Sequence, residues 1–133
     1  MILALGIVAP AAAALAASPP TALAKVAAGM WEISGVPGTK APLRQCVANV
    51  LALAQFEHRS KACKANVIGN GERTTRIAYD CGSSGFGQSE VDVITPRSLK
   101  IATQGISDQQ PFNYTLQAHR VGECEKSPST PSH

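Results

Sequence analysis

The sequence predicts an α+β domain in which one helix packs on the apolar face of a curved antiparallel sheet, a partly open, barrel-like meander held by two disulfides. Three observations lead to this fold class. From Cys63 onward, apolar and polar residues alternate with period two, as in strands with one buried face. An earlier segment repeats its apolar residues at helical spacing. The chain also contains 4 cysteines, an even number that fits two disulfides.

The first 24 residues have the composition of a signal peptide. No charged residue precedes Lys25, and prolines interrupt the apolar, alanine-rich run, which makes it a poor membrane-spanning helix. The small residues Ala22 and Ala24 precede a cleavage site before Lys25. We therefore expect residues 1–24 to be removed during export to the periplasm or the medium, which would leave no transmembrane anchor.

Residues 25–124 have the length of one small domain, too short for two independent cores. Residues 125–133 are rich in serine and proline and poor in apolar residues, which predicts a disordered C-terminal tail. The formal net charge is +3, and the lysines and arginines are scattered among acidic residues. This pattern is typical of a solvated surface and argues against nucleic acid as a partner.

The first predicted strand covers residues 29–36, where Trp31 and Ile33 lie on the same side. The predicted helix covers residues 42–57. Its apolar stripe consists of Leu43, Cys46, Val47, Val50, Leu51 and Ala54. We expect this stripe to pack on the apolar face of the sheet.

Recognisable turns separate the later strands. Asn70-Gly71 is a strong hairpin signal, and Thr95-Pro96-Arg97-Ser98 marks a second turn. A loop rich in glycine and serine lies between them at residues 82–85. The residues expected to face the core are Thr75, Ile77, Tyr79, Cys81, Ser89, Val91, Val93, Leu99, Ile101, Thr103, Phe112, Tyr114, Leu116 and Ala118.

Cys46, Cys63, Cys81 and Cys124 are too widely spaced for a zinc pattern, and no histidine completes one. We expect two disulfides and no metal. Cys81 and Cys124 each extend the apolar series of a strand, so both are predicted to point toward the core and to pair with each other. Cys46, on the predicted helix, is then left for Cys63.

Several features occur in a recognisable order. They are Gly29-Met30-Trp31-Glu32, a cysteine in the segment that follows, a second cysteine after it, two more in the later strands, Thr95-Pro96-Arg97-Ser98-Leu99, and Phe112-Asn113-Tyr114. From about Lys25 to Cys124 the chain thereby resembles the domain of unknown function 3617 family, small exported proteins of Gram-negative bacteria. The resemblance implies a single domain in the cell envelope, and it implies no activity and no site residues.

Some residues are candidates for contact with a ligand. Trp31 could stack on one, although its phase along the strand favours core packing. The polar face of the sheet is a candidate recognition surface, and the loop over residues 82–87 could contribute or could be a plain connection. The candidates are Trp31, Arg76, Ser83, Ser84, Phe86 and His119.

The sequence contains no arrangement typical of an enzyme. Residues 82–87 do not form a nucleophile elbow, and His58 and His119 are predicted at a helix end and on a polar strand face. We expect a non-enzymatic, monomeric module without a cofactor, which binds an envelope ligand or protein through the sheet face or its end loops. The alternative is an inhibitor of a cell-wall hydrolase, similar to lysozyme inhibitors in size and disulfide use, with residues 82–87 as the inserted loop.

Overall fold

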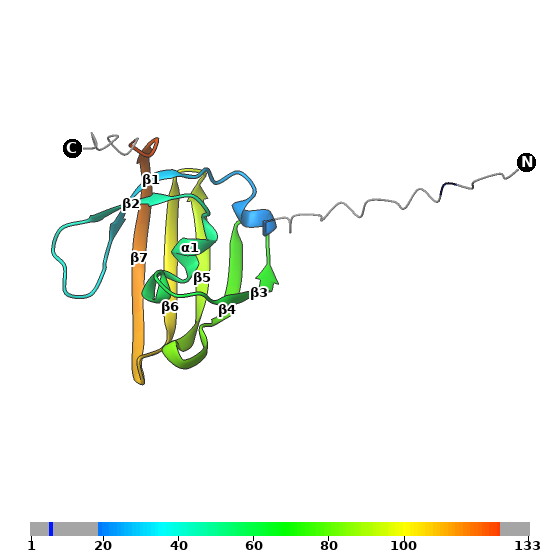
Figure 1. Ribbon diagram of the computed structural model, residues 1–133. Coiled ribbons are helices and arrows are strands. Elements are labelled where there is room, and N and C mark those ends of the chain that lie inside the picture. Colours follow the sequence, from blue (N-terminus) through cyan, green and yellow to red (C-terminus); the bar gives the residue numbers. More distant parts are fainter. Residues whose placement is uncertain (1–5, 7–18, 126–133) are drawn as a thin grey trace, which may run out of the picture.

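Seven antiparallel strands form one curved sheet in the computed structural model of the chain (Figure 1). The structure describes residue 6 and residues 19–125. The strands are β1 (Gly29–Ser34), β2 (Leu43–Val47), β3 (Lys64–Asn70), β4 (Thr74–Asp80), β5 (Gly85–Thr95), β6 (Ser98–Ser107) and β7 (Gln110–Gly122). Helical structure in these residues consists of α1 (Leu51–Ala54) and short 3₁₀ turns at Thr21–Leu23, Phe56–His58 and Gly82–Ser84.

The strand order across the sheet is β2-β1-β7-β6-β5-β4-β3. Strands β3 to β7 follow one another as a meander, as the turn signals predict. The N-terminal hairpin joins at the other side, where β1 pairs with β7 and β2 pairs with β1. Because β2 and β3 are the two ends of this order, the sheet stays open. The expected curved, partly open antiparallel sheet with two disulfides is confirmed.

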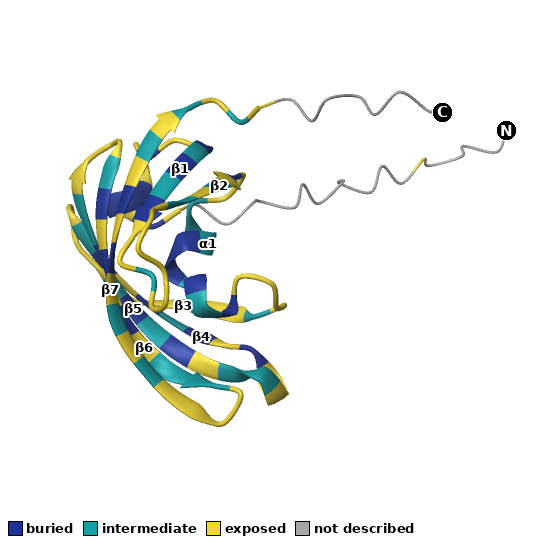
Figure 2. Ribbon diagram, turned by 90° about the vertical axis from the view of Figure 1, so that its left-hand side faces the viewer, coloured by how far each residue is buried: buried dark blue, intermediate teal, exposed yellow. Residues whose placement is uncertain are grey.

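The core lies on the concave side of the sheet, and α1 lies within this concavity (Figure 2). Along β4 to β7, buried residues alternate with half-buried or exposed ones. Trp31 and Ile33 on β1 have 0% exposed surface. The other buried strand residues are Val47, Thr75, Ile77, Tyr79, Ser89, Val91, Leu99, Ile101, Thr103, Leu116 and Ala118. The period-two pattern therefore predicts correctly which face of these strands is buried.

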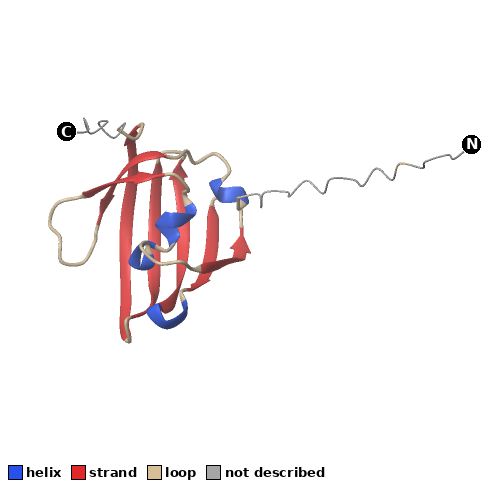
Figure 3. Ribbon diagram, in the orientation of Figure 1, coloured by secondary structure: helices blue, strands red, loops and turns tan. Residues whose placement is uncertain are grey.

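The helix predicted over residues 42–57 is wrong in extent, because its first part is β2 and α1 has a single turn (Figure 3). Leu43 and Val47 are four residues apart, as on a helix face, but Leu43, Gln45 and Val47 also alternate as in a strand. The open edge of β1 provides backbone donors and acceptors for this segment, and β2 pairs with it over residues 43–47. Tertiary pairing therefore overrides the helical spacing.

The remainder of this segment still covers the apolar face. Leu53, Ala54 and Phe56 are each 1% exposed and belong to the core. The buried hydroxyl of Ser89 on β5 donates a hydrogen bond to the carbonyl oxygen of Ala54, which ties α1 to the sheet. Packing on the apolar face is thus achieved by one helical turn and one 3₁₀ turn.

The disulfides join Cys46 to Cys124 and Cys63 to Cys81, so the predicted pairs Cys46–Cys63 and Cys81–Cys124 are wrong. Strand direction gives the reason. β4 and β7 run in opposite directions, so Cys81 lies near the start of β7, whereas Cys124 follows its end. Because β7 has 13 residues, its two ends are about 40 Å apart at about 3.3 Å per residue. Cys63 instead precedes β3, whose first residue pairs with the last residue of β4.

Most of the predicted leader, residues 1–24, lies outside the described residues, as does the predicted tail beyond residue 125. The last residues of the predicted leader are well packed, because Ala22 is 5% and Leu23 is 4% exposed, and Leu23 belongs to the core cluster. The backbone N–H of Thr21 also donates to the side-chain oxygen of Asn70 at 2.9 Å. In the described part of the chain, no helix combines the length and apolarity required to cross a membrane.

Candidate ligand-binding site

The outer face of the sheet, turned away from α1, carries a row of amide side chains. The strand register places Asn66 of β3 opposite Ala78 of β4, Ala78 opposite Gln88 of β5, Gln88 opposite Gln104 of β6, and Gln104 opposite Asn113 of β7. Residues paired in this way lie side by side on one face of a sheet. Four amide groups from four strands therefore form one line across the strands, interrupted only by a methyl group.

Two neighbouring rows border the amide row. On one side, Phe86 is opposite Ile106, and its ring is 56% exposed. On the other side, Arg76 is opposite Glu90, and their side chains form an ion pair at 3.3 Å. The border at Phe86 and Ile106 is apolar and continues into Asp80 and Lys64 on β4 and β3. The other border holds the Arg76–Glu90 pair, whose two charges neutralise each other.

The surface over these rows is hollowed. One hollow of about 460 Å³ is lined by Asn66, Ala78, Phe86, Gln88 and Gln104, among others. A second, of about 190 Å³, shares the two glutamines and continues toward β7. We call the combined hollow the outer groove; its lining includes Asn66, Arg76, Ala78, Phe86, Gln88, Glu90, Gln104 and Asn113. Volumes of this size accommodate small molecules or part of an extended chain.

Two of the residues singled out in the sequence belong to the outer groove, Arg76 and Phe86. His119 is exposed on β7 outside the groove, and its ring nitrogen lies 3.3 Å from the hydroxyl of Ser98. Ser83 is exposed in the 3₁₀ turn, and Ser84 is partly buried there. The loop expected over residues 82–87 is therefore a short turn followed by the first residues of β5.

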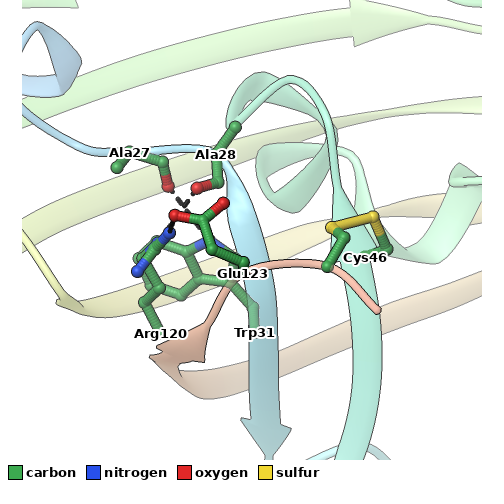
Figure 4. Close-up of a disulfide and its surroundings, with 7 residues drawn as sticks. Ala27, Ala28, Trp31, Cys46, Arg120 and Glu123 are labelled. Atoms are coloured by element: carbon green, nitrogen blue, oxygen red, sulfur yellow. Dashed lines mark hydrogen bonds and ion pairs between the residues drawn. A yellow bond between two sulfur atoms is a disulfide. The ribbon is translucent and has the colours of Figure 1, made fainter. Parts of the chain in front are cut away.

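Trp31 lies in the core and offers no surface to a ligand. Its indole N–H donates to the carbonyl oxygen of Ala27 at 3.2 Å, as Figure 4 shows next to the Cys46 disulfide. In the same view, the guanidinium of Arg120 binds the carbonyl oxygen of Ala28 and the carboxylate of Glu123, both at 2.9 Å. These contacts attach the segment before β1 to the core and to the end of β7.

The inner face contains a second polar cluster, around His58. The ring of His58 is 2% exposed, and its Nε2 lies 3.1 Å from the carbonyl oxygen of Ser84. A carbonyl oxygen only accepts, so Nε2–H is the donor; in the neutral ring, Nδ1 then accepts from the hydroxyl of Tyr79 at 3.3 Å. His58, predicted at a helix end, is therefore a buried link between the Phe56–His58 turn and the Gly82–Ser84 turn.

A glycine in β5 makes room for this cluster. A Cβ atom on Gly87 would collide with the hydroxyl of Tyr79. The hydroxyl end of Tyr79 therefore lies over the backbone of β5 at Gly87, and the Tyr79 and His58 rings form an edge-to-face pair with a centroid distance of 5.3 Å. The sequence predicts a loop or a plain connection after Cys81. In the structure, Gly87 of this glycine-rich segment makes room for the packing of Tyr79.

Next to this cluster, the hydroxyl of Tyr114 donates to the carboxylate of Glu57 at 2.6 Å. An open cleft of about 540 Å³ borders the pair, with Arg59 and Phe112 in its wall. The guanidinium of Arg59 lies 4.2 Å from the centre of the Phe56 ring, so it is held against the protein surface. The Tyr114 hydroxyl and the Glu57 carboxylate already bind each other. This cleft is therefore a weaker candidate for a ligand-binding site than the outer groove.

Because of its two tyrosines, the folded protein is expected to lose stability at alkaline pH. Burial raises the pKa of Tyr79, and burial together with the acceptor carboxylate of Glu57 raises that of Tyr114. A folded-state pKa above the unfolded value of 10.0 gives stability that is complete below pH 10 and is lost as the pH rises above it. We expect the free energy of unfolding to fall by up to about 1.4 kcal/mol per pH unit for each tyrosine.

Urea unfolding at pH 8, 10 and 11 measures this loss. The chain has 2 tyrosines, so the double variant Tyr79→Phe/Tyr114→Phe removes all tyrosine titration. The stability of that variant should decline less steeply above pH 10 than that of the wild type. Equal slopes for both proteins would show that other groups cause the alkaline loss.

The amide row is not predictable from the sequence alone. Gln88 and Asn113 are recognisable as members of polar strand faces, but nothing in the sequence aligns them with Gln104 and Asn66. The only available signal is the register counted outward from the two turns. Among the described residues, no group of three His, Cys, Asp or Glu side chains is arranged to hold a metal ion.

Comparison with known proteins identifies no family for this chain. No protein-family model matches it, no curated protein does, and no solved structure does. The resemblance to the domain of unknown function 3617 family therefore stays a prediction.

Proposed function

We propose that this protein is an exported, non-enzymatic binding module that holds its ligand in the outer groove. The amide row is the observation that carries this proposal. Asparagine is depleted in strands, so strand propensity does not explain Asn66 and Asn113 at these positions. Amide groups both donate and accept hydrogen bonds, and here they line a hollow beside an exposed aromatic ring.

Export is supported by the composition of the leader, by the two disulfides and by the resemblance to exported proteins. A cut before Lys25 would remove Leu23, which is 4% exposed in the core. We therefore expect the exported chain to retain Thr21–Leu23. The N-terminal mass of the protein recovered from the envelope fraction reports this directly.

Photo-crosslinking in cells tests the site. A photoreactive amino acid is placed at Gln104, in the middle of the amide row, and, in a second protein, at Gln117, an exposed glutamine of β7 opposite Lys100 and outside the groove. We expect a covalent adduct at position 104, visible as a mass shift of the purified protein, and none at position 117.

Adding Gln88→Ala should lower the yield of the adduct at position 104, because Gln88 is the direct neighbour of Gln104 in the row. Adducts of equal yield at positions 104 and 117 would indicate nonspecific contact. No adduct at position 104 would contradict the assignment of the outer groove as the binding site.

A further inference from the structure

We propose that the ligand of the outer groove is an extended, uncharged glycan chain that lies across the strands, along the amide row. This inference rests on the proposed function and adds the chemical class of the ligand. Four properties of the groove support it: the pairing of donors and acceptors, the exposed ring of Phe86, the balance of charge, and the length of the row.

The hydrogen-bonding groups of the row suit sugar hydroxyls. Each amide of Asn66, Gln88, Gln104 and Asn113 provides an acceptor oxygen and a donor nitrogen, and a hydroxyl group also does both. A ligand that only accepts, such as a phosphate chain, would leave the amide oxygens unpaired. A ligand that only donates would leave the amide nitrogens unpaired, so a polyhydroxylated chain uses the row most completely.

The exposed ring of Phe86 provides an apolar surface beside the row. It is 56% exposed and lines the larger hollow together with Gln88 and Gln104. A pyranose ring has C–H groups on its faces and hydroxyls around its rim, so one sugar can contact an aromatic ring and an amide row together. A ligand that covers the exposed part of this ring would remove apolar surface from water, and the adjacent amides would bind its polar groups, so the pair favours a ligand with both kinds of surface.

The charges around the groove cancel. Arg76 and Glu90 are paired at 3.3 Å, and Lys64 lies opposite Asp80 in the strand register. The groove therefore has no excess of either sign to select a charged ligand, and the neutral amides lie between the two pairs. An uncharged chain complements this arrangement.

The row is long enough for several linked sugars. It spans five strands, from β3 to β7, with adjacent strands about 4.8 Å apart. The four intervals give a length of about 19 Å. The regular spacing of the amides along this line favours a linear chain of repeating units over a single compact sugar.

Titration with defined oligosaccharides tests the ligand class. The probes are cellohexaose and hexa-N-acetylchitohexaose, two uncharged chains of β-1,4-linked sugars, the second of which carries N-acetyl groups. Hexagalacturonate serves as an anionic chain of the same length. Amide chemical shifts of the ¹⁵N-labelled protein give both the affinity and the position of binding. We expect at least one uncharged chain to shift residues of the amide row, and hexagalacturonate to bind at least tenfold more weakly.

The variants Gln88→Ala/Gln104→Ala and Phe86→Ala should each weaken binding about tenfold, as expected for the loss of two hydrogen bonds or of one aromatic contact. Gln117→Ala is the matched control on the same face and should bind as the wild type does. All replaced side chains are at least partly exposed, and the dispersion of the free-protein spectrum verifies the fold of each variant.

If neither uncharged chain binds, or if the three groove substitutions leave binding unchanged, the glycan inference is wrong. In that case, an adduct at position 104 in cells would show that the groove holds a ligand of another class. The proposed binding function would then hold without the glycan inference. Stronger binding of hexagalacturonate would also overturn the inference. The two uncharged chains distinguish an N-acetylated envelope glycan from a plain one.

Discussion

Replacing Cys46 and Cys124 together by alanine is expected to lower the free energy of unfolding by about 4.5 kcal/mol. The disulfide closes a loop with a sequence separation of 78, and in the chain-entropy model a closed loop of that length gives a stabilisation of this size. Cys46 lies on β2, an edge strand paired with β1 alone, and Cys124 follows the end of β7. Without the bridge, the unfolded chain gains freedom over most of the domain.

The matched control is Cys63→Ala/Cys81→Ala. The sequence separation of this pair is 18, for which the same model gives about 3 kcal/mol. Urea unfolding followed by Trp31 fluorescence measures both losses, since the chain has 1 tryptophan. A larger loss for Cys63/Cys81 than for Cys46/Cys124 would contradict the loop-length explanation.

Peptide mapping tests the connectivity itself. Trypsin cuts after lysine and arginine, so each cysteine falls in its own peptide: residues 45–59, 62–64, 77–97 and 121–126. Without reduction, the first peptide should be linked to the last, and the second to the third. A link between the first two peptides would restore the pairing predicted from the sequence.

Trp31→Ala is expected to lower the free energy of unfolding by about 4 kcal/mol, the middle of the range for removing a large buried aromatic side chain. Trp31 has 0% exposed surface and lies on β1, in the middle of the core. The substitution leaves a cavity on the concave side and frees the carbonyl oxygen of Ala27 from the indole N–H. Both effects weaken the attachment of the segment before β1.

Trp31→Phe separates the two contributions. It keeps most of the apolar volume and loses the hydrogen bond, so we expect a smaller loss of about 1 to 2 kcal/mol. Because both variants lack the fluorescent side chain, far-ultraviolet circular dichroism should follow urea unfolding. A loss below about 1 kcal/mol for Trp31→Ala would indicate that the core closes around the missing ring.

The outer groove depends on irregularities in the strands. The β5–β6 register shifts between Val93 and Thr95, so Ile94 is the extra residue of a bulge. Counting back from the Thr95–Ser98 pair without this bulge would place Gln88 opposite Gly105 instead of Gln104. The β3–β4 register shifts in the same way between Val67 and Gly69. No residue pattern in the sequence predicts these bulges. A register shift of one residue moves every side chain of a strand to the opposite face, so the composition of the outer groove depends on the bulges.

Three features of the fold follow from residue spacing alone: the alternation that buries one face of β4 to β7, the hairpin at Asn70-Gly71, and the presence of two disulfides. These features are local, since each depends on residue spacing along a single strand or turn. The strand at residues 43–47, the disulfide pairing and the amide row depend on contacts between segments far apart in the chain. Residues 43–47 form a strand because they pair with the free edge of β1. Cys81 does not pair with Cys124 because the antiparallel strands before them end at opposite ends of the sheet. The amide row likewise exists only where four separate strands meet in register.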